Sequence, residues 1–194
     1  MTFEGYGAFD DPYVYKGTSV LKNKLGTRDA AALSAFEVEM TTLRAEEPLP
    51  TGRLGAAHYR ATHRHLFQDV YRWAGRYRTV RTAKDGNVFC YPEHIPREMD
   101  RIFAALRRDA FLADRSFDEF VTGAADFLAE LNAIHPFREG NGRTQLSFLF
   151  LLAGRAGHPL DFTVLRPAEF LRAMVLSFGG DTSALVRQIR ALRA

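Results

Sequence analysis

Three residues with chemically useful side chains fall close together in the segment from His135 to Arg143, which reads HPFREGNGR. The imidazole of His135 titrates near neutral pH, so it can accept the proton of a hydroxyl group that attacks phosphorus. The carboxylate of Glu139 is a hard oxygen ligand of the kind that holds Mg²⁺ beside phosphate oxygens. The guanidinium of Arg143 can donate two parallel hydrogen bonds to a polyphosphate. Their combination predicts transfer of a phosphate-containing group, with His135 and Arg143 as catalytic residues and Glu139 as the metal ligand.

The backbone of the same segment is suited to binding an anion. One predicted helix ends before Pro136 and another begins near Asn141, and the first amides of a helix have no intrahelical partner and carry a partial positive charge. Gly140 and Gly142 lack Cβ atoms, so they can adopt positive φ and let a phosphate approach the amides closely. The expected nucleotide-binding set is Phe137, Gly140, Asn141, Gly142 and Arg143.

Each of these residues also has a structural interpretation. We interpret Phe137 as an anchor whose buried ring fixes the loop, and Asn141 as a helix cap, a phosphate ligand or both. Taken one at a time, His135 would end a helix, Glu139 would favour the helix dipole, and Arg143 would be a solvated helix residue. The joint occurrence of all of them at this spacing favours the chemical interpretation.

The hydrophobic pattern predicts helices on both sides of the segment. Apolar residues recur at helical spacing in seven stretches, and Ser116 and Glu119 have the spacing of a capping box. The helix that begins near Asn141 is apolar around most of its circumference, so we expect it in the centre of the bundle. Thr27 is the predicted N-cap of the first helix. The predicted helices span 27–48, 54–70, 94–110, 116–135, 141–157, 167–178 and 181–194.

Two segments depart from the helical period. Between Tyr77 and Tyr91, short stretches rich in β-branched and aromatic residues flank Asp85 and Gly86, a pattern typical of a β-hairpin. The first 26 residues are rich in Gly, Tyr, Asp and Lys and are predicted to form an ordered N-terminal arm. Since no internal repeat or linker interrupts the chain, we expect a single all-α domain over residues 1–194 with one small hairpin.

The composition limits the classes of protein that fit. Of 194 residues, 46% are hydrophobic and 25% are charged, which is typical of soluble globular proteins. The longest apolar stretch, Leu146 to Ala153, is much shorter than the ~20 residues that cross a bilayer, and Met1 to Gly7 does not resemble a secretory signal. We therefore expect no membrane association and a cytoplasmic location at synthesis. The 26 Lys and Arg against 23 Asp and Glu are scattered, which does not favour a nucleic-acid partner.

Other polar and aromatic residues are interpreted as structural. His58, His63 and His65 lack carboxylates or cysteines at metal-ligand spacing, so we read them as helix-surface or packing residues. Trp73 is expected to be a core aromatic below the hairpin. The single cysteine, Cys90, is expected to be a packing residue. We interpret Lys22, Asn23 and Lys24 as part of a solvated loop rather than as nucleotide contacts.

The segment HPFREGNGR matches the signature of the Fic family, His-x-Phe-x-(Asp/Glu)-Gly-Asn-Gly-Arg-x-x-Arg, at every position except the last. The stretches YVYKGTSVLKNKLG, HRHLFQDVYRWAGRYRTVR and FCYPEHI also resemble Fic proteins, particularly bacterial toxins and type IV secretion effectors. The resemblance covers residues 13–178. It implies a Fic-type helical bundle in which the motif joins two central helices, with the hairpin at residues 78–91 forming a flap that takes up the target protein as an added strand.

The resemblance also implies an activity. His135 would be the base that activates a Ser, Thr or Tyr hydroxyl of the target, Glu139 would hold Mg²⁺, and the residues from Gly140 to Arg143 would cradle the phosphates of ATP. The hydroxyl would attack the α-phosphorus, pyrophosphate would leave, and the target would carry AMP. The chain would then be a protein adenylyltransferase, an AMPylation enzyme, acting in the cytoplasm or in a host cell that it reaches without a signal peptide.

Leu146 is the one departure from the motif, because it stands where the family usually has a second arginine that contacts the terminal phosphate of ATP. Losing one charge-assisted hydrogen bond costs roughly 1.5 to 3 kcal/mol, which leaves the choice of nucleotide open. Other Fic-type transfers, of phosphate, UMP or phosphocholine, are alternatives, as is a degenerate Fic domain that only binds a partner. A DNA-binding role in an operon with an antitoxin comes third. The inhibitory motif (Ser/Thr)-x-x-x-Glu-(Gly/Asn) is absent from the sequence, so a small antitoxin would supply inhibition or this regulation has been lost.

Overall fold

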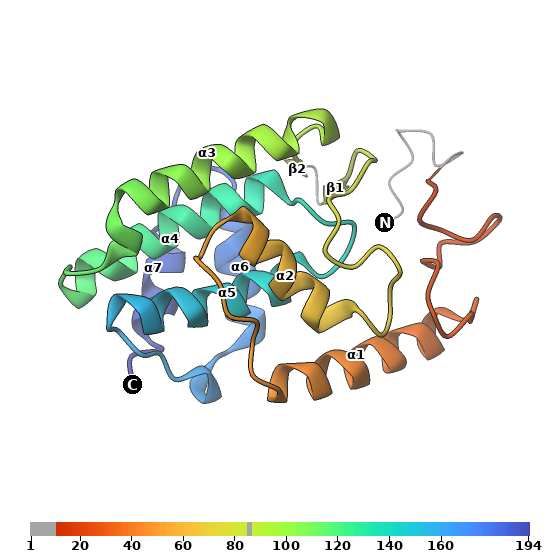
Figure 1. Cartoon of the computed structure of the whole chain (residues 1–194), viewed down its shortest axis with the longest axis horizontal. Coiled ribbons are helices and arrows are strands. Elements are labelled where there is room, and N and C mark those ends of the chain that lie inside the picture. Colours follow the sequence, from red (N-terminus) through yellow and green to blue (C-terminus); the bar gives the residue numbers. More distant parts are fainter. Residues whose placement is uncertain (1–10, 85–86) are drawn as a thin grey trace.

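The computed structural model describes residues 11–84 and 87–194, and these residues fold into a bundle of helices (Figure 1). They form seven α-helices and a two-stranded hairpin, which confirms the predicted all-α class. Short 3₁₀ helices cover Pro92–His94, Ala110–Leu112 and Phe162–Val164. The α-helices are α1 (Ala30–Glu46), α2 (Ala56–Phe67), α3 (Ile95–Arg108), α4 (Phe117–Ile134), α5 (Asn141–Ala156), α6 (Pro167–Ser177) and α7 (Ser183–Arg190).

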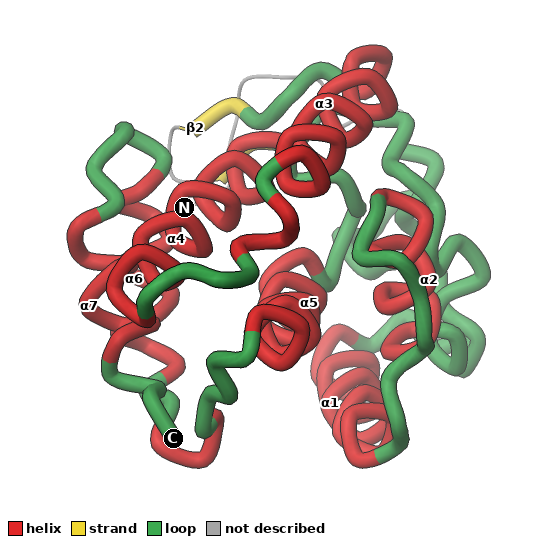
Figure 2. Tube along the Cα trace, turned by 60° about the vertical axis from the view of Figure 1, so that its left-hand side comes forward, coloured by secondary structure: helices red, strands yellow, loops and turns green. Residues whose placement is uncertain are grey.

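Helix α5 lies at the centre of the bundle. Figure 2 shows it nearly end-on, with α1 and α2 on one side and α4 and α6 on the other. Both α2 and α4 contact α5 directly, and α4 also contacts α3, α6 and α7. The rings of Phe103, Phe120 and Phe148 are buried in the apolar core that these helices share. The segment between α4 and α5 therefore joins two central helices of the bundle.

Helix α4 begins at the predicted capping box. The hydroxyl of Ser116 accepts a hydrogen bond from the amide of Glu119 at 3.4 Å, and the Glu119 carboxylate accepts one from the amide of Ser116 at 2.9 Å. These two bonds satisfy amides that the helix itself leaves unpaired. The helix ends at Ile134 because His135 adopts a left-handed backbone conformation, with φ of 48°.

The N-cap of α1 is Asp29, so the prediction of Thr27 as the cap was wrong. A carboxylate oxygen of Asp29 accepts hydrogen bonds from the amides of Ala31 and Ala32 at 2.8 and 3.0 Å. Thr27 instead accepts a hydrogen bond from the amide of Asp29 at 3.1 Å. Since both residue types cap helices well, the sequence pattern did not distinguish them.

Two helices are shorter than their sequence patterns. Helix α2 begins at Ala56 rather than Leu54, because Leu54 has a positive φ of 49°. It ends at Phe67, after which hydrogen-bonded turns carry the chain to Val70. Helix α7 ends at Arg190, and the following residues approach the loop after α5, where Arg193 pairs with Leu160 in an isolated bridge.

A second apolar cluster joins the N-terminal arm and α1 to α2. The arm is described from residue 11, and the predicted residues 1–10 lie outside the described part of the chain. An isolated bridge links Val14 with Leu21, and the amide of Lys24 donates to the carbonyl of Val70 at 2.8 Å. The buried members of the cluster are Val20, Leu21, Leu33, Leu66, Phe67, Val70, Tyr71 and Ala74.

The predicted hairpin consists of two very short antiparallel strands, β1 (Ala83–Lys84) and β2 (Asn87–Val88). Ala83 pairs with Val88 and Lys84 with Asn87, while the predicted turn residues 85–86 lie outside the described part of the chain. Below the strands, the amide of Phe89 donates to the carbonyl of Thr82 at 3.2 Å. None of the helices in the described residues combines the length and apolar character needed to cross a membrane.

Candidate active site

The loop between α4 and α5 is closed by its own asparagine. The side chain of Asn141 is buried, and its amide accepts a hydrogen bond from the backbone N–H of Phe137 at 2.9 Å and donates one to the Phe137 carbonyl at 2.8 Å. The N-cap of α5 is Gly140, and no side chain caps the helix. The predicted role of Asn141 as a helix cap was therefore wrong, because its side chain holds the loop in a closed shape instead.

The two glycines of the loop have different roles. Gly140 has a φ of +81°, and a Cβ at this position would lie 2.3 Å from the ring of Phe67, so only glycine fits. Gly142 has a helical backbone in the first turn of α5, and nothing lies within 4 Å of the place its Cβ would take. The expected positive φ is found at Gly140 but not at Gly142. The space beside Gly142 leaves this face of the first helical turn uncovered.

Phe137 is fully buried behind the loop. Its ring stacks on the imidazole of His63 with the centroids 3.8 Å apart, and on the ring of Tyr59 at 5.6 Å. Phe137 does not line the pocket that the other loop residues share. Its contribution is to fix the loop from behind rather than to meet a ligand.

His63, on α2, supports the loop in a way that the sequence pattern did not indicate. Its Nδ1 accepts a hydrogen bond from the amide of Gly75 at 2.8 Å, so the ring proton lies on Nε2, which donates to the carbonyl of Glu139 at 3.0 Å. The side chain is fully buried, and this burial lowers its pKa to about 4. His63 is therefore a neutral packing residue that fixes the backbone of Glu139.

The other two histidines of α2 are structural as well, as predicted. His58 accepts a hydrogen bond from the amide of Leu54 at 3.2 Å, and its other ring nitrogen bonds the carbonyl of Pro50 at 2.6 Å. His65 bonds the carbonyl of Arg44 at 2.8 Å. In the described ranges no group of three or more His, Cys, Asp or Glu side chains is arranged to hold a metal ion.

Arg143 is held in place by residues of α1 and α2. Its guanidinium pairs with the carboxylate of Glu37 and donates to the hydroxyl of Thr41 at 3.2 Å. It also lies over the ring of Phe67, 4.6 Å from the centroid. The carboxylate of Glu139 accepts a hydrogen bond from the amide of Gly140 at 2.8 Å and lies 3.8 Å from the guanidinium. Glu37 is a contact that the sequence pattern did not reveal, since it lies far from the motif in the chain.

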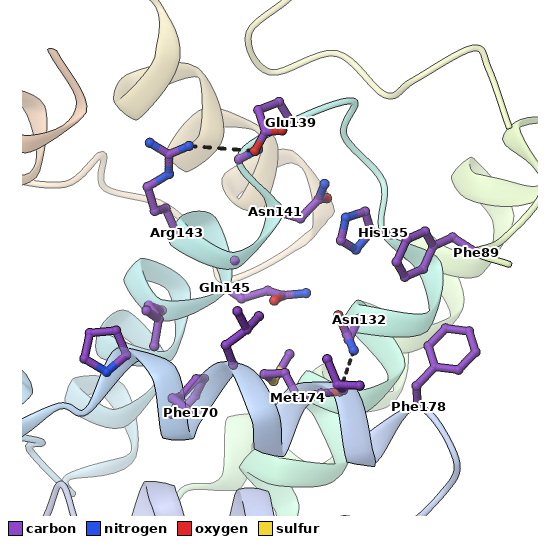
Figure 3. Close-up of a pocket in the computed structure, with 16 residues that line it drawn as sticks. Phe89, Asn132, His135, Glu139, Asn141, Arg143, Gln145, Phe170, Met174 and Phe178 are labelled. Atoms are coloured by element: carbon purple, nitrogen blue, oxygen red, sulfur yellow. Dashed lines mark hydrogen bonds and ion pairs between the residues drawn. The ribbon is translucent and has the colours of Figure 1, made fainter. Parts of the chain in front are cut away.

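His135 faces the pocket beside an aromatic ring from the hairpin segment. Figure 3 shows the imidazole next to Phe89, and the two rings stack with centroids 3.9 Å apart and 10° between their planes. The ring of Phe178 packs edge-on against Phe89 at 5.7 Å. The residue after the hairpin and the residue that caps α4 therefore form one wall of the pocket.

The pocket has a volume of about 400 Å³ and two unlike sides. One side carries His135, Glu139 and Arg143 with the first turn of α5, and the other is an apolar surface of α6 (Figure 3). Gln145 of α5 lies between the two sides, and Leu146 also lines the pocket (Figure 3). The amide nitrogen of Gln145 is buried without a hydrogen-bond partner among the described residues. The lining residues of α6 are Pro167, Phe170, Leu171, Met174 and Val175.

The remaining sequence candidates lie outside this pocket. Asn23 is buried, and its side-chain amide forms hydrogen bonds with the backbone of Leu21 and Thr27. These bonds hold the loop of the N-terminal arm in shape. Trp73 is half-buried and stacks on Tyr71 at 4.3 Å, within the second apolar cluster rather than below the hairpin. Cys90 is partly buried beside the main core, as expected of a packing residue.

The arrangement defines a class of helical domain with a pocket at the first turn of its central helix, and solved structures share this class. The fold resembles the BepC protein of Bartonella tribocorum with bound AMPPNP, at 26% identity and a TM-score of 0.86, over 97% of this chain and 99% of that one. It also resembles the Fic domain of a Bartonella quintana effector with bound ADP, at 27% identity and a TM-score of 0.85, over 94% of each chain.

Sequence comparison reaches the same class. The chain is 53% identical to the probable protein adenylyltransferase y4lH of Sinorhizobium fredii, over 96% of this chain and 98% of that protein. It is 36% identical to the protein adenylyltransferase VbhT of Bartonella schoenbuchensis, over 94% of this chain and 40% of that protein. Residues 53–153 match the sequence model of the Fic/DOC family. The chain belongs to the Fic/DOC family.

Proposed function

We propose that this protein is an adenylyltransferase that moves AMP from ATP onto a Ser, Thr or Tyr hydroxyl of another protein. The observation that carries the proposal is the shared pocket: His135, Glu139 and Arg143 line one cavity together with the uncovered first turn of α5. A cavity of about 400 Å³ is within the range of small-molecule sites. Its apolar side, on α6, suits the base and ribose of a nucleotide.

Each residue has a distinct task in this reaction. The amides of Asn141 and Gly142 and the guanidinium of Arg143 bind the phosphates, because helix N-termini attract anions. The amide of Gly140 instead holds the carboxylate of Glu139 beside them. His135 accepts the proton of the target hydroxyl as its oxygen bonds to the α-phosphorus. The bond from the α-phosphorus to the bridging oxygen breaks, and pyrophosphate leaves with its electron pair. The product is an AMP ester on the target side chain.

Glu139 is suited to holding Mg²⁺ beside the phosphates. Its carboxylate faces the pocket and is partly exposed, and a single carboxylate with phosphate oxygens and water is the usual environment of this ion. When bound, Mg²⁺ neutralises negative charge on the phosphates. Because the His63 hydrogen bond fixes the Glu139 backbone, the carboxylate begins from a defined position.

The hairpin is the proposed docking site for the target. Strand β2 leads directly into Phe89, which stacks on His135, so a peptide added to this edge would lie beside the base. Main-chain pairing orients a segment whatever its side chains, which brings a hydroxyl into reach of His135. A small antitoxin protein is the proposed inhibitor, and the cytoplasm or a host cell is the proposed place of action.

A second candidate function follows from Leu146. This side chain lines the pocket where Fic proteins usually have an arginine, so the donor of the transferred group is not restricted to ATP by a second guanidinium. Transfer of phosphate, UMP or phosphocholine is the alternative that this feature favours. The mass of the adduct on the target distinguishes these reactions from adenylylation.

The test is incubation of the protein with ATP labelled in the α-phosphate, Mg²⁺ and bacterial or host lysate. We expect a labelled protein whose labelling is lost with His135→Ala, because this variant has no base. A degenerate binding module would instead retain the same partner with and without the imidazole and label nothing. Absence of any label that depends on His135 would contradict the proposed function.

A further inference from the structure

Arg78 is a buried arginine at the base of the hairpin. It lies between α2 and β1, and only 2% of it is exposed. Its guanidinium donates hydrogen bonds to four backbone carbonyls and forms no ion pair with any carboxylate of residues 11–84 and 87–194. Burial without a counter-charge is costly for a cation, and it lowers the pKa of Arg78 to about 10.

The four carbonyls belong to two parts of the chain. Two lie on the hairpin segment, at Val80 and Cys90, each 2.6 Å from a terminal guanidinium nitrogen. The other two lie at the C-terminus of α4, where Nε donates to His135 at 2.8 Å and Nη2 to Ile134 at 3.2 Å. The C-terminal end of a helix carries a partial negative charge, which compensates part of the free-energy cost of burying this cation.

Backbone hydrogen bonds join the same two segments that the Arg78 side chain joins. The amide of Arg78 donates to the carbonyl of Pro136 at 2.9 Å, and the amide of Cys90 donates to Ala133 at 3.1 Å. His135 has a left-handed backbone conformation, which is uncommon for residues other than glycine. Arg78 fixes the direction of its carbonyl. The imidazole of the same residue stacks on Phe89 (Figure 3).

We propose that Arg78 is a positioning residue that couples the hairpin to the base, so that seating a target strand and aligning His135 are one structural event. The planar guanidinium has donors on separate edges and can therefore reach both sets of carbonyls at once. The catalytic meaning of this coupling rests on the proposed function, whereas the coupling itself does not.

The test compares Arg78→Lys with the unchanged protein. A lysine keeps the positive charge but presents one ammonium group, which cannot bridge the hairpin and α4 together. The matched control is Ile189→Ala, because Ile189 is a fully buried core residue of α7 that does not line the pocket. Its truncation lowers stability without touching the hairpin or the motif loop.

The first measurement is amide hydrogen exchange, which needs no enzymatic activity. We expect Arg78→Lys to accelerate exchange at least about tenfold for the amides of Phe89, Cys90 and His135 together, with α3 unchanged. Ile189→Ala should not produce this selective pattern. The proposal is overturned if the variant accelerates exchange evenly across the chain, or changes the hairpin amides while the His135 amide stays as it was.

The second measurement separates binding from reaction. Because the phosphate cradle is held by other contacts, we expect a non-hydrolysable ATP analogue to bind Arg78→Lys within about threefold of the unchanged protein, while labelling of the target falls at least about tenfold. Equal loss in Ile189→Ala at the same degree of folding would overturn the positioning role. If the unchanged protein labels nothing, the proposed function fails, and the exchange experiment still decides the coupling.

Discussion

The ring of Phe89 lies parallel to the imidazole of His135, with their centroids 3.9 Å apart, although the two residues belong to different elements. Phe89 directly follows β2 of the hairpin, and His135 is the residue that caps the C-terminus of α4. The stack restricts the imidazole to one orientation toward the pocket and places the segment after the hairpin against this imidazole. The proposed docking edge for the target strand is therefore in direct contact with His135, the residue proposed to accept the proton of the target hydroxyl.

Replacing Phe89 tests this contact. An aromatic pair contributes about 0.5 to 1.5 kcal/mol beyond the area it buries, so Phe89→Leu should lower the rate of target labelling by roughly two- to tenfold. Phe178→Leu is the matched control, since its ring touches Phe89 edge-on but does not stack on His135. Initial rates of labelling at saturating ATP make the comparison, and equal rates for both variants would argue against an orienting role.

Restoring an arginine at position 146 should strengthen binding of the triphosphate. Leu146→Arg adds a guanidinium to the lining of the pocket, and one charge-assisted hydrogen bond to phosphate is worth about 1.5 to 3 kcal/mol. The affinity for a non-hydrolysable ATP analogue is expected to rise by roughly ten- to a hundredfold, while that for AMP stays unchanged. Calorimetric titration with both nucleotides, with Leu146→Met as the control, distinguishes a phosphate contact from a general change of charge.

His63 should make stability depend on pH. In the unfolded chain its imidazole titrates near 6.5, whereas burial lowers the folded pKa to about 4. The unfolded chain therefore binds more protons between these values, and the contribution of His63 to stability is complete above pH 6.5 and lost as the pH falls toward 4. The total is roughly 3 kcal/mol.

The measurement is urea unfolding at several pH values for the unchanged protein and His63→Gln. Glutamine can form both hydrogen bonds but does not titrate. The difference between the two curves is therefore the contribution of His63 titration to stability. We expect that difference to shrink as the pH falls from 6.5 to 4. Two curves that stay parallel over this range would show that folding does not lower the pKa of His63.

The two glycines of the loop should respond oppositely to alanine. Gly140→Ala places a methyl group 2.3 Å from the Phe67 ring at a positive φ, so we expect a loss of at least about 2 kcal/mol of unfolding free energy. Gly142→Ala lies in a helix with open space around it, and it should keep or slightly raise stability. Urea unfolding of both variants checks the pair, and similar losses at both positions would contradict the geometry.

Much of the fold and the outline of the site follow from local patterns. The capping box at Ser116, the apolar period of α5 and the composition of the segment from His135 to Arg143 all act within a few residues, so their consequences are visible in the sequence. Where two local solutions had similar free energy, the pattern was insufficient. Asp29 rather than Thr27 caps α1, and Asn141 closes the loop instead of capping α5.

The contacts that hold the site in shape became apparent only in the folded chain. Arg78 reaches the carbonyl of His135 across 57 positions, His63 reaches Glu139 across 76, and Glu37 reaches Arg143 across 106. In the sequence, Arg78 is a charged residue of a predicted hairpin, and His63 and Glu37 are polar residues of predicted helices, so nothing near them in the chain indicates their partners. Burial and the demand that buried polar groups find partners give them their roles, and packing of distant elements creates both conditions.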